Sequence, residues 1–232
     1  MQPVEITREI NLTHNTNKEV GNLQIRNYAA VIATLYLGKK TMAKQAKTLN
    51  EQELRKVLDY ISLRKHSARN RALLMTTFLS GMRVGEVASL RFNDVVDGEG
   101  NVRNEIRLTP EMTKGQFARV VFVNERLRKE LDKYMCFYCP VDKTMKFFYS
   151  QKKDSDGFNA NTLTQHFHFL YRRAGIDGAS SHSGRRSFIT NLASKGVSVR
   201  VLMSLAGHRS ISTTQAYIDI NDNMLRSAVE LA

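Results

Sequence analysis

Two side chains of the segment His182-Ser183-Gly184-Arg185 could act together on a phosphate group. Positions i and i+3 share one face of a helix, so His182 and Arg185 would lie side by side. A histidine can move a proton near neutral pH, whereas a guanidinium keeps its charge. This combination suits a phosphoryl transition state, in which one group transfers a proton and the other holds the equatorial oxygens. The H-x-x-R spacing is common, however, and alone it does not distinguish a catalytic pair from two surface residues.

A second arginine, Arg83, follows a glycine that should end one helix and allow another to begin. Gly81 interrupts the helix predicted over Arg69 to Ser80, which puts Arg83 in the first turn of the next helix. An exposed helix N-terminus carries unpaired N–H groups and the positive end of the helix dipole, so an arginine there suits a phosphate. The alternative is a surface arginine that pairs with Glu86, three residues later.

A histidine and a tyrosine follow at the C-terminal end of the sequence. Gly207 can end a helix in the left-handed conformation, so that His208 would project just beyond that end. Ser212 can cap the next helix, which carries Tyr217. Tyrosines at such positions are usually amphipathic core or interface residues, and that reading stays open for Tyr217.

A lysine lies on the turn of a predicted β-hairpin. Lys114 is followed by Gly115, which gives the bend freedom, and Arg119 opens the second strand. A flexible hairpin could carry Lys114 over a bound substrate. The alternative is a solvated hairpin tip.

The elements that must position these residues are mostly helices. Asn50 with Glu53 forms a capping box, and Leu49 with Leu54 forms a hydrophobic staple at the start of one helix. Short strands are predicted over Asn104 to Leu108, Arg119 to Val123 and Lys146 to Ser150. Further helices are predicted over Thr162 to Ala174, Arg185 to Lys195, Val199 to Ala206 and Thr213 to Ile220. The predicted fold class is therefore mostly α with a small antiparallel β-sheet (α+β).

Composition narrows the class of partner. The chain has 232 residues, 42% of them hydrophobic, and a formal net charge of +13. This charge is spread along the chain, which favours a folded surface that binds nucleic acid over a basic tail, with a solvated basic surface as the alternative. The longest apolar run, Tyr28 to Leu37, is about half a membrane span. The residues before it are acidic and rich in asparagine, unlike the basic start of a signal peptide. We expect a soluble cytoplasmic protein that makes no membrane contact.

Two cysteines, Cys136 and Cys139, form a single C-x-x-C pair. They cannot build a disulfide framework, which indicates a reducing compartment. A zinc ion would need His166 or His168 as further ligands, and these two residues would lie on different faces of one helix. The pattern favours two ordinary thiols.

Taken together, these residues give an ordered set that resembles the catalytic domain of the tyrosine recombinases, the phage integrase family. Residues 67–98 resemble the first arginine box of that family, residues 182–195 its H-x-x-R box and residues 202–219 its G-H…Tyr box. The stretch from Lys114 to Val121 is similar to its lysine hairpin. The resemblance covers residues 49–231. In chain order, the set is Arg83, Lys114, His182, Arg185, His208 and Tyr217.

The resemblance implies a role for each of these residues. Tyr217 would attack the scissile phosphate of DNA to leave a 3′-phosphotyrosine and a free 5′-hydroxyl. Arg83 and Arg185 would hold the non-bridging oxygens, and Lys114 would protonate the departing oxygen. His182 would assist proton transfer at the tyrosine, His208 would hydrogen-bond a phosphate oxygen, and Glu86 would orient the site. Neither a metal nor another cofactor is implied, because the cationic side chains supply the electrostatic stabilisation.

Some features depart from the family pattern. Ser183-Gly184 stands where a larger apolar residue is usual, which would loosen the helix start, and Arg186 leaves a one-residue uncertainty in the second arginine. Ala206 replaces a frequent leucine. Residues 1–48 are too short for the core-binding domain that most relatives carry. We therefore expect a basic N-terminal arm or linker with one helix, followed by a catalytic domain over 49–232, as in minimal recombinases such as the fimbrial-switch invertases.

The expected partners are double-stranded DNA, further copies of the chain and an accessory DNA-bending protein. An apolar face on the segment from Asn223 to Leu231 would dock on its own domain or, as the resemblance implies, on a neighbour in a tetramer on two DNA sites. The expected function is site-specific recombination, as integration, excision or inversion, by the enzyme of a bacterium, phage or mobile element. The alternatives are a catalytically weak DNA-binding regulator and a nicking-closing enzyme of the topoisomerase IB type.

Overall fold

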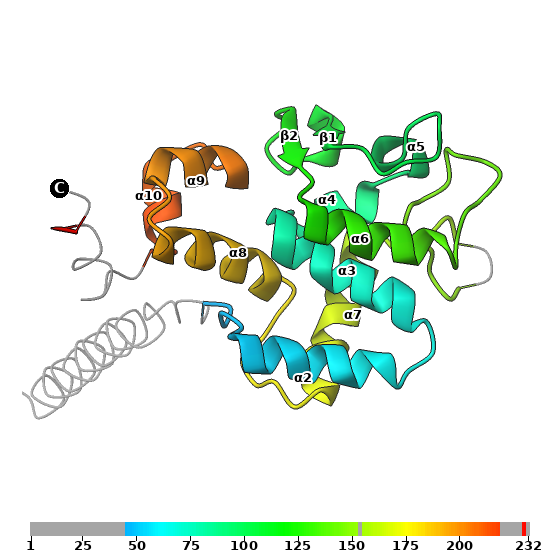
Figure 1. The fold of residues 1–232 in the computed structure, drawn as a ribbon, viewed down its shortest axis with the longest axis horizontal. Coiled ribbons are helices and arrows are strands. Elements are labelled where there is room, and N and C mark those ends of the chain that lie inside the picture. Colours follow the sequence, from blue (N-terminus) through cyan, green and yellow to red (C-terminus); the bar gives the residue numbers. More distant parts are fainter. Residues whose placement is uncertain (1–44, 153–154, 219–228, 231–232) are drawn as a thin grey trace, which may run out of the picture. The chain divides into compact units, whose positions relative to one another are not determined.

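The computed structural model describes residues 45–152, 155–218 and 229–230 (Figure 1). The helix predicted within residues 1–48 and most of the predicted terminal helix, Asn223 to Leu231, lie outside the described residues. The described residues from Ala46 on belong to one compact unit. In this part of the chain, no helix is both long enough and apolar enough to cross a membrane.

The unit begins with the helix α2 (Glu51–Ser62), which starts as the sequence predicts. The Asn50 side chain accepts a hydrogen bond from the Glu53 backbone N–H, and the Glu53 carboxylate accepts one from the Asn50 N–H. These two bonds satisfy donors that the helix itself leaves unpaired. Leu54, Val57 and Ile61 then form the buried stripe of α2.

The helix α3 (Ser67–Ser80) forms the centre of the unit. It is buried over most of its circumference and packs against α2, α6 (Glu125–Met135), α8 (Ser183–Ser194) and α4 (Val84–Ser89) (Figure 1). A helix that is covered on several sides belongs to the core of a domain. Gly81 ends α3 with a φ of 66°, in the left-handed region that favours glycine.

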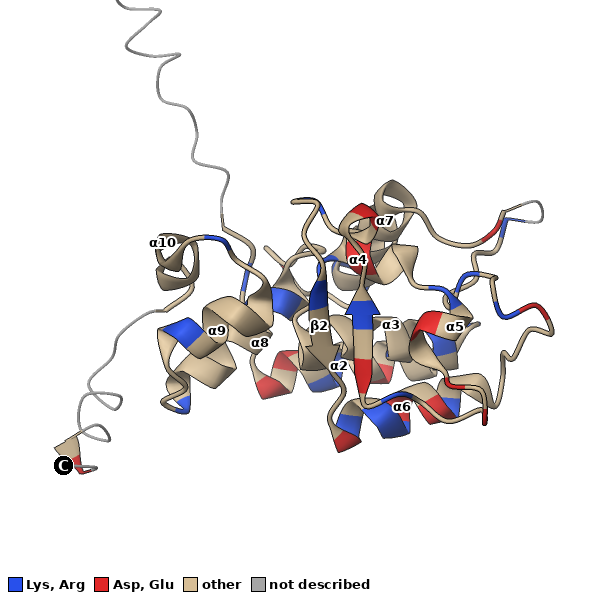
Figure 2. Ribbon diagram, turned by 90° about the horizontal axis from the view of Figure 1, so that it is seen from above, with Lys and Arg blue, Asp and Glu red and all other residues tan. Residues whose placement is uncertain are grey.

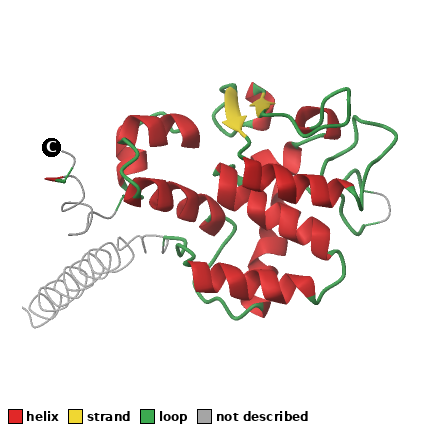
Figure 3. Ribbon diagram, in the orientation of Figure 1, coloured by secondary structure: helices red, strands yellow, loops and turns green. Residues whose placement is uncertain are grey.

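A two-stranded antiparallel sheet follows the short helix α5 (Phe92–Val95). Strand β1 (Glu105–Leu108) pairs with β2 (Arg119–Phe122) in the register Glu105 opposite Phe122, and the connection contains the 3-10 turn η1 (Pro110–Met112). Ile106, Leu108 and Val121 face the core. The prediction of a mostly helical fold with a small antiparallel sheet is confirmed (helices red and strands yellow in Figure 3).

The third strand predicted over Lys146 to Ser150 is wrong, because the segment makes only an isolated bridge between Lys146 and Arg91. Phe147 and Phe148 are both buried, so the segment lacks the alternation of inner and outer residues that a half-buried strand has. Its backbone bonds go instead to Leu90 and Phe158.

The helix α6 was not predicted, although the sequence carries its signals. Asn124 caps the helix by accepting a hydrogen bond from the Leu127 N–H, and Leu127, Leu131 and Tyr134 follow at helical spacing and are buried. Glu130 is also buried, and both of its oxygens accept hydrogen bonds from Arg71 of α3, at 2.6 and 2.7 Å. This two-point ion pair fastens α6 to the central helix.

Four helices complete the described unit: α7 (Ala160–Arg173), α8, α9 (Val199–Ala206) and α10 (Ile211–Gln215). The first three agree with prediction to within two residues at each end. The prediction for the last helix is wrong, because Ser210 rather than Ser212 caps α10. The helix therefore starts and ends early, and Tyr217 lies in the turn that follows it.

The start of α8 is tightly packed, contrary to the expectation that Ser183-Gly184 would loosen it. The Ser183 hydroxyl accepts a hydrogen bond from the Ser180 N–H at 2.9 Å, and Ser183 is fully buried. A Cβ on Gly184 would overlap the side chain of Thr77 in α3 and approach the Thr77 backbone carbon to 3.2 Å. Glycine thus allows α8 to lie directly on the central helix.

This close approach predicts that Gly184→Ala destabilises the protein. We expect a loss of about 1–3 kcal/mol in the free energy of unfolding, because an added methyl group overpacks a filled interface. Urea denaturation measures the change. Gly98→Ala is the matched control, since a Cβ at Gly98 meets nothing within 4 Å. Equal stability of the two variants would contradict the described packing of α8 on α3.

Candidate active site

Arg185 lies in the first turn of α8 and is almost fully buried. Its Nη1 donates to the carbonyl of Gly81 at 2.6 Å, and its Nη2 donates to the carbonyl of Ala206 at 2.7 Å. These carbonyls stand at the C-terminal ends of α3 and α9, where helix dipoles place partial negative charge. Burial and the charge of Arg83 lower the pKa of Arg185 to about 10, so the guanidinium remains charged at neutral pH. The ends of two helices therefore hold this cation.

Arg83 stands at the N-cap of α4, one position before the helical turn that the sequence predicts. Its Nη1 donates to Glu86 Oε1 at 2.8 Å, and its backbone N–H donates to Glu86 Oε2 at 2.7 Å. Its Nη2 donates to the carbonyl of Gly207 at 3.1 Å. The pairing with Glu86 that the sequence offered as an alternative is thus formed, and the same bonds bring Arg83 to the end of α9.

A third guanidinium, that of Arg119, completes this cluster, although the sequence did not single it out as a site residue. Its Nη2 donates to Glu86 Oε2 at 2.6 Å, and its Nη1 donates to the carbonyl of Leu205 at 2.9 Å. A Cβ on Gly207 would approach Arg119 Cδ to 2.6 Å. The available signal was strand alternation, because Arg119 shares the inward face of β2 with the buried Val121.

The carboxylate of Glu86 is buried between the two arginines that it binds. Burial alone would raise its pKa, but the hydrogen bonds and charges of Arg119 and Arg83 outweigh that effect and lower the pKa overall. Glu86 is therefore ionised at neutral pH. Within the described part of the chain, it is the carboxylate that contacts these guanidinium groups.

His208 follows Gly207, which ends α9 with a φ of 63° as predicted. Its Nε2 lies 2.7 Å from Arg185 Nη2, and its Nδ1 lies 2.9 Å from the hydroxyl of the buried Thr214. A guanidinium can only donate, so Nε2 accepts and the ring proton resides on Nδ1. Burial and the charges of Arg185, Arg83 and Arg119 lower the pKa of His208 to about 4. The ring is thus neutral at physiological pH.

Tyr217 lies against His208 just beyond α10. The two rings stack with centroids 5.5 Å apart and an angle of 26° between their planes. The Arg186 guanidinium lies over the Tyr217 ring, 5.4 Å from its centroid, and Thr190 Oγ1 donates to the Tyr217 carbonyl at 3.2 Å. Arg186 also donates to Thr48 Oγ1. Of the two adjacent arginines, Arg185 is therefore the one bound to His208.

His182 occupies the N-cap position of α8, one turn before Arg185. His182 is exposed to solvent, but desolvation by the neighbouring protein atoms and the charges of Arg185, Arg83 and Lys114 lower its pKa. The ring is therefore neutral at pH 7 and can accept a proton.

Lys114 lies in the exposed loop between β1 and β2, and it lines the same cavity as Arg83 and His208. This cavity has a volume of about 480 Å³. The expectation that Gly115 supplies the freedom of the bend is wrong, because Gln116 is the residue with a positive φ, at 53°. Arg209, the residue after His208, donates a hydrogen bond to the Gly115 carbonyl of this loop at 3.3 Å. The lysine is thus carried on a loop that is fastened beside His208.

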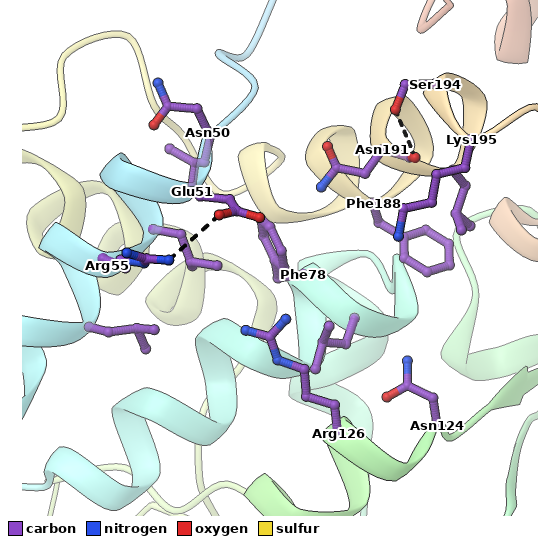
Figure 4. Close-up of a pocket in the computed structure, with 15 residues that line it drawn as sticks. Asn50, Glu51, Arg55, Phe78, Asn124, Arg126, Phe188, Asn191, Ser194 and Lys195 are labelled. Carbon is purple, nitrogen blue, oxygen red and sulfur yellow. Dashed lines mark hydrogen bonds and ion pairs between the residues drawn. The ribbon is translucent and has the colours of Figure 1, made fainter. Parts of the chain in front are cut away.

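A larger cavity of about 590 Å³ lies between α2, α3, α6 and α8 (Figure 4). Its lining mixes both signs of charge, with Arg55 3.7 Å from Glu51. None of the six predicted catalytic residues is among the residues that line it.

The candidate zinc ligands do not gather around one point. Cys136 and Cys139 are exposed free thiols. In the described ranges, no group of three or more His, Cys, Asp or Glu side chains is arranged to hold a metal ion.

Comparison with known proteins identifies relatives of the chain. Residues 47–224 match the phage integrase family. The tyrosine recombinase XerA of Pyrococcus furiosus is 29% identical over 186 residues, which cover 80% of this chain and 62% of the relative. The crystal structure of XerA recombinase superposes with a TM-score of 0.62 at 25% identity, covering 83% of this chain and 65% of that one.

A further solved structure, that of the XerH site-specific recombinase bound to palindromic difH substrate in a post-cleavage complex, has a TM-score of 0.60 at 24% identity. The match covers 78% of this chain and 51% of that one, and it shows a shared fold. The chain spans less than two thirds of the length of the relatives described here.

The contacts of His208 predict a loss of stability in acid. Its pKa is about 4 in the folded protein and 6.5 in the absence of these contacts. Because the unfolded chain binds the proton first as the pH falls, the contribution is fully present above pH 6.5 and is lost as the pH falls towards 4. A ¹³C NMR titration of the ring should have its midpoint near 4, and His208→Gln should flatten the pH dependence of the unfolding free energy in this window. A midpoint near 6.5 would contradict the described contacts.

Proposed function

Because the chain belongs to the phage integrase family, we propose that it is a tyrosine site-specific recombinase, which cleaves and rejoins DNA strands through a phosphotyrosine intermediate. Membership in the family confirms the resemblance seen in the sequence. One observation carries the proposal. Tyr217 stacks on His208, and His208 is hydrogen-bonded to the buried Arg185 beside Arg83. A potential nucleophile thus lies against a histidine that is bonded to one of two neighbouring cations that could hold a phosphate.

The charge of the site supports a phosphate as the reacting group. Arg83, Arg119, Arg185 and Lys114 bring four positive charges, and the contacting carboxylate Glu86 offsets one. A phosphoryl transition state carries added negative charge on its equatorial oxygens, so fixed cations stabilise it more than they stabilise the substrate. The bonds to Glu86 and to the carbonyls at helix ends hold Arg83, Arg119 and Arg185 in fixed positions, which limits reorganisation during the reaction.

In the proposed cleavage step, the Tyr217 oxygen forms a bond to phosphorus while the bond from phosphorus to the 5′-oxygen breaks. The tyrosine proton passes to a base, and the neutral His182 is suited to accept it. Lys114 gives a proton to the departing 5′-oxygen, which is a poor leaving group without one. Rejoining is the same step in reverse, and the phosphotyrosine bond preserves the energy that it requires.

Arg83 and Arg185 hold the non-bridging oxygens in this proposal. His208 would hydrogen-bond a phosphate oxygen in its other neutral tautomer, with the proton on Nε2 donated to the phosphate and Nδ1 accepting from the Thr214 hydroxyl, while Arg185 Nη2 turns to the phosphate. Glu86 acts through Arg83, and Arg119 acts through Glu86, so both are positioning residues in this proposal. These roles keep the assignments that the sequence suggested and add Arg119.

The distribution of charge supports double-stranded DNA as the partner. Lys and Arg (blue in Figure 2) occur on β1, β2, α6 and α9 rather than in one segment. Together with a formal net charge of +13, this arrangement suits contacts to a phosphate backbone.

Assembly of further copies on the DNA is also part of the proposal. The apolar positions between Asn223 and Leu231 would dock on a neighbouring copy in a tetramer on two DNA sites, with an accessory DNA-bending protein where the sites require it. Residues 49–232 would form the catalytic domain and residues 1–48 a basic arm or linker. The enzyme would serve integration, excision or inversion of a mobile or chromosomal segment.

The proposal predicts a covalent adduct that depends on Tyr217. Nicked DNA duplexes with a randomised central sequence trap the cleaved state, because the short strand beyond the nick dissociates. We expect the wild-type protein to form an SDS-resistant adduct with a subset of these duplexes, and Tyr217→Phe to form none. Denaturing gels and sequencing of the captured DNA provide the measurement.

Tyr138→Phe is the matched control, since Tyr138 is a partly buried tyrosine on another part of the fold and should leave the adduct intact. An adduct that survives Tyr217→Phe would exclude Tyr217 as the nucleophile. Wild-type protein that binds the duplexes without forming any adduct would instead favour the alternative of a catalytically weak DNA-binding regulator.

A further inference from the structure

A second buried arginine lies at the other end of the central helix and lacks a carboxylate partner among the described residues. Arg69, in the first turn of α3, has an exposed fraction of 2%. Its guanidinium lies 4.8 Å from the Tyr149 ring centroid and 5.1 Å from that of Phe158. Its hydrogen bonds go to Asn70 Oδ1 and to the Tyr149 carbonyl, which are neutral acceptors.

This arrangement leaves both charge and donors available. A guanidinium has five N–H donors, and three bonds from Arg69 are described. Arg71, two residues later on the same helix, forms a two-point pair with Glu130 and is thus neutralised. A buried cation is costly unless an anion offsets it, and of these two arginines Arg69 is the one whose charge an external anion could offset.

A histidine without a hydrogen-bond partner adjoins Arg69. The ring of His166, on α7, lies 5.2 Å from the same Phe158 ring that Arg69 covers. Its Nε2 is buried and has no partner among the described residues. Burial and the charge of Arg69 lower the pKa of His166 to about 4, so the ring is neutral and can donate one N–H to an anion.

Both residues line a cavity of about 320 Å³ between α2, α3 and α7. Its rim carries the exposed cations Arg64, Lys65 and Arg173, and no carboxylate is among the residues that line it. Each of the two rim arginines lies over an aromatic ring, Arg64 over Tyr60 and Arg173 over the half-exposed Phe169. Guanidinium groups together with partly exposed aromatic rings suit a phosphate that is attached to a base.

The cavity is separate from the candidate active site. Arg69 and Gly81, whose carbonyl binds Arg185, stand near opposite ends of α3. Their separation along the helix is roughly 18 Å, at about 1.5 Å per residue.

We propose that this cavity is a second anion site, which takes the phosphate group of a nucleotide or of a nucleic-acid backbone through Arg69, Arg64, Arg173 and His166. The phosphate oxygens would accept hydrogen bonds from the free N–H groups of Arg69 and from His166 Nε2, while the rim arginines supply charge from the solvent side. The site binds its ligand without any bond being made or broken.

The test follows the ring signals of His166 by ¹³C and ¹⁵N NMR in the full-length Tyr217→Phe protein, where no cleavage takes place. His166→Gln assigns the signal. The probes are AMP, inorganic phosphate and a short duplex DNA, each against chloride at equal ionic strength. We expect AMP at millimolar concentration to shift the His166 signal in a saturable way. Movement caused by duplex DNA would identify the nucleic-acid backbone as the source of the phosphate, and movement caused by AMP alone would identify a free nucleotide.

Variants of the rim keep the test independent of folding, because a change at the buried Arg69 itself could unfold the protein. Arg64→Ala combined with Arg173→Ala should raise the half-saturation concentration of AMP at least about threefold, since each exposed ion pair contributes modestly to binding. Arg55→Ala, an exposed arginine on α2 outside the cavity, should change it little. A His166 signal that responds to no probe, or one whose response is unchanged in the rim variant, would overturn the proposal. Neither result bears on Tyr217, whose role the covalent adduct tests separately.

Discussion

The carboxylate of Glu86 allows positively charged groups to gather in one buried place. It accepts hydrogen bonds from Arg83 and Arg119, while Arg185 is held by the carbonyls of Gly81 and Ala206. A full negative charge thus compensates one part of the cluster, and the partial charges of two helix ends compensate the other. The geometry of the site therefore depends on where α3 and α9 end.

Much of this arrangement was accessible from the sequence, because short-range rules determine it. The left-handed glycines at the ends of α3 and α9, and the cap of α2, follow from residue type and spacing. Long-range contacts were not accessible in the same way. The bond from Arg119 to Glu86 spans 33 residues, and the fit of Gly184 against Thr77 depends on how α8 crosses α3. The false strand over Lys146 to Ser150 arose because consecutive buried phenylalanines resemble a strand until their packing is known.

The buried arginines at the two ends of the central helix α3 differ in how far their positive charge is neutralised. At one end, the site of Arg83 and Arg185 contains a buried carboxylate that organises the cations. At the other end, Arg69 contacts aromatic rings and neutral acceptors. In the first environment the excess of positive charge suits a transition state, whereas in the second it suits a bound ground-state anion.

Replacement of Glu86 by Gln tests the organising role of this carboxylate most directly, with Glu86→Asp as the conservative variant. The measured quantities are the rate of covalent adduct formation at saturating DNA and the dissociation constant for that DNA, at a temperature where the variant stays folded. If Glu86 organises the cations, Glu86→Gln lowers the rate about 100-fold or more, Glu86→Asp restores part of it, and DNA affinity changes little. A rate that stays at the wild-type level in the folded Gln variant would exclude this role of Glu86.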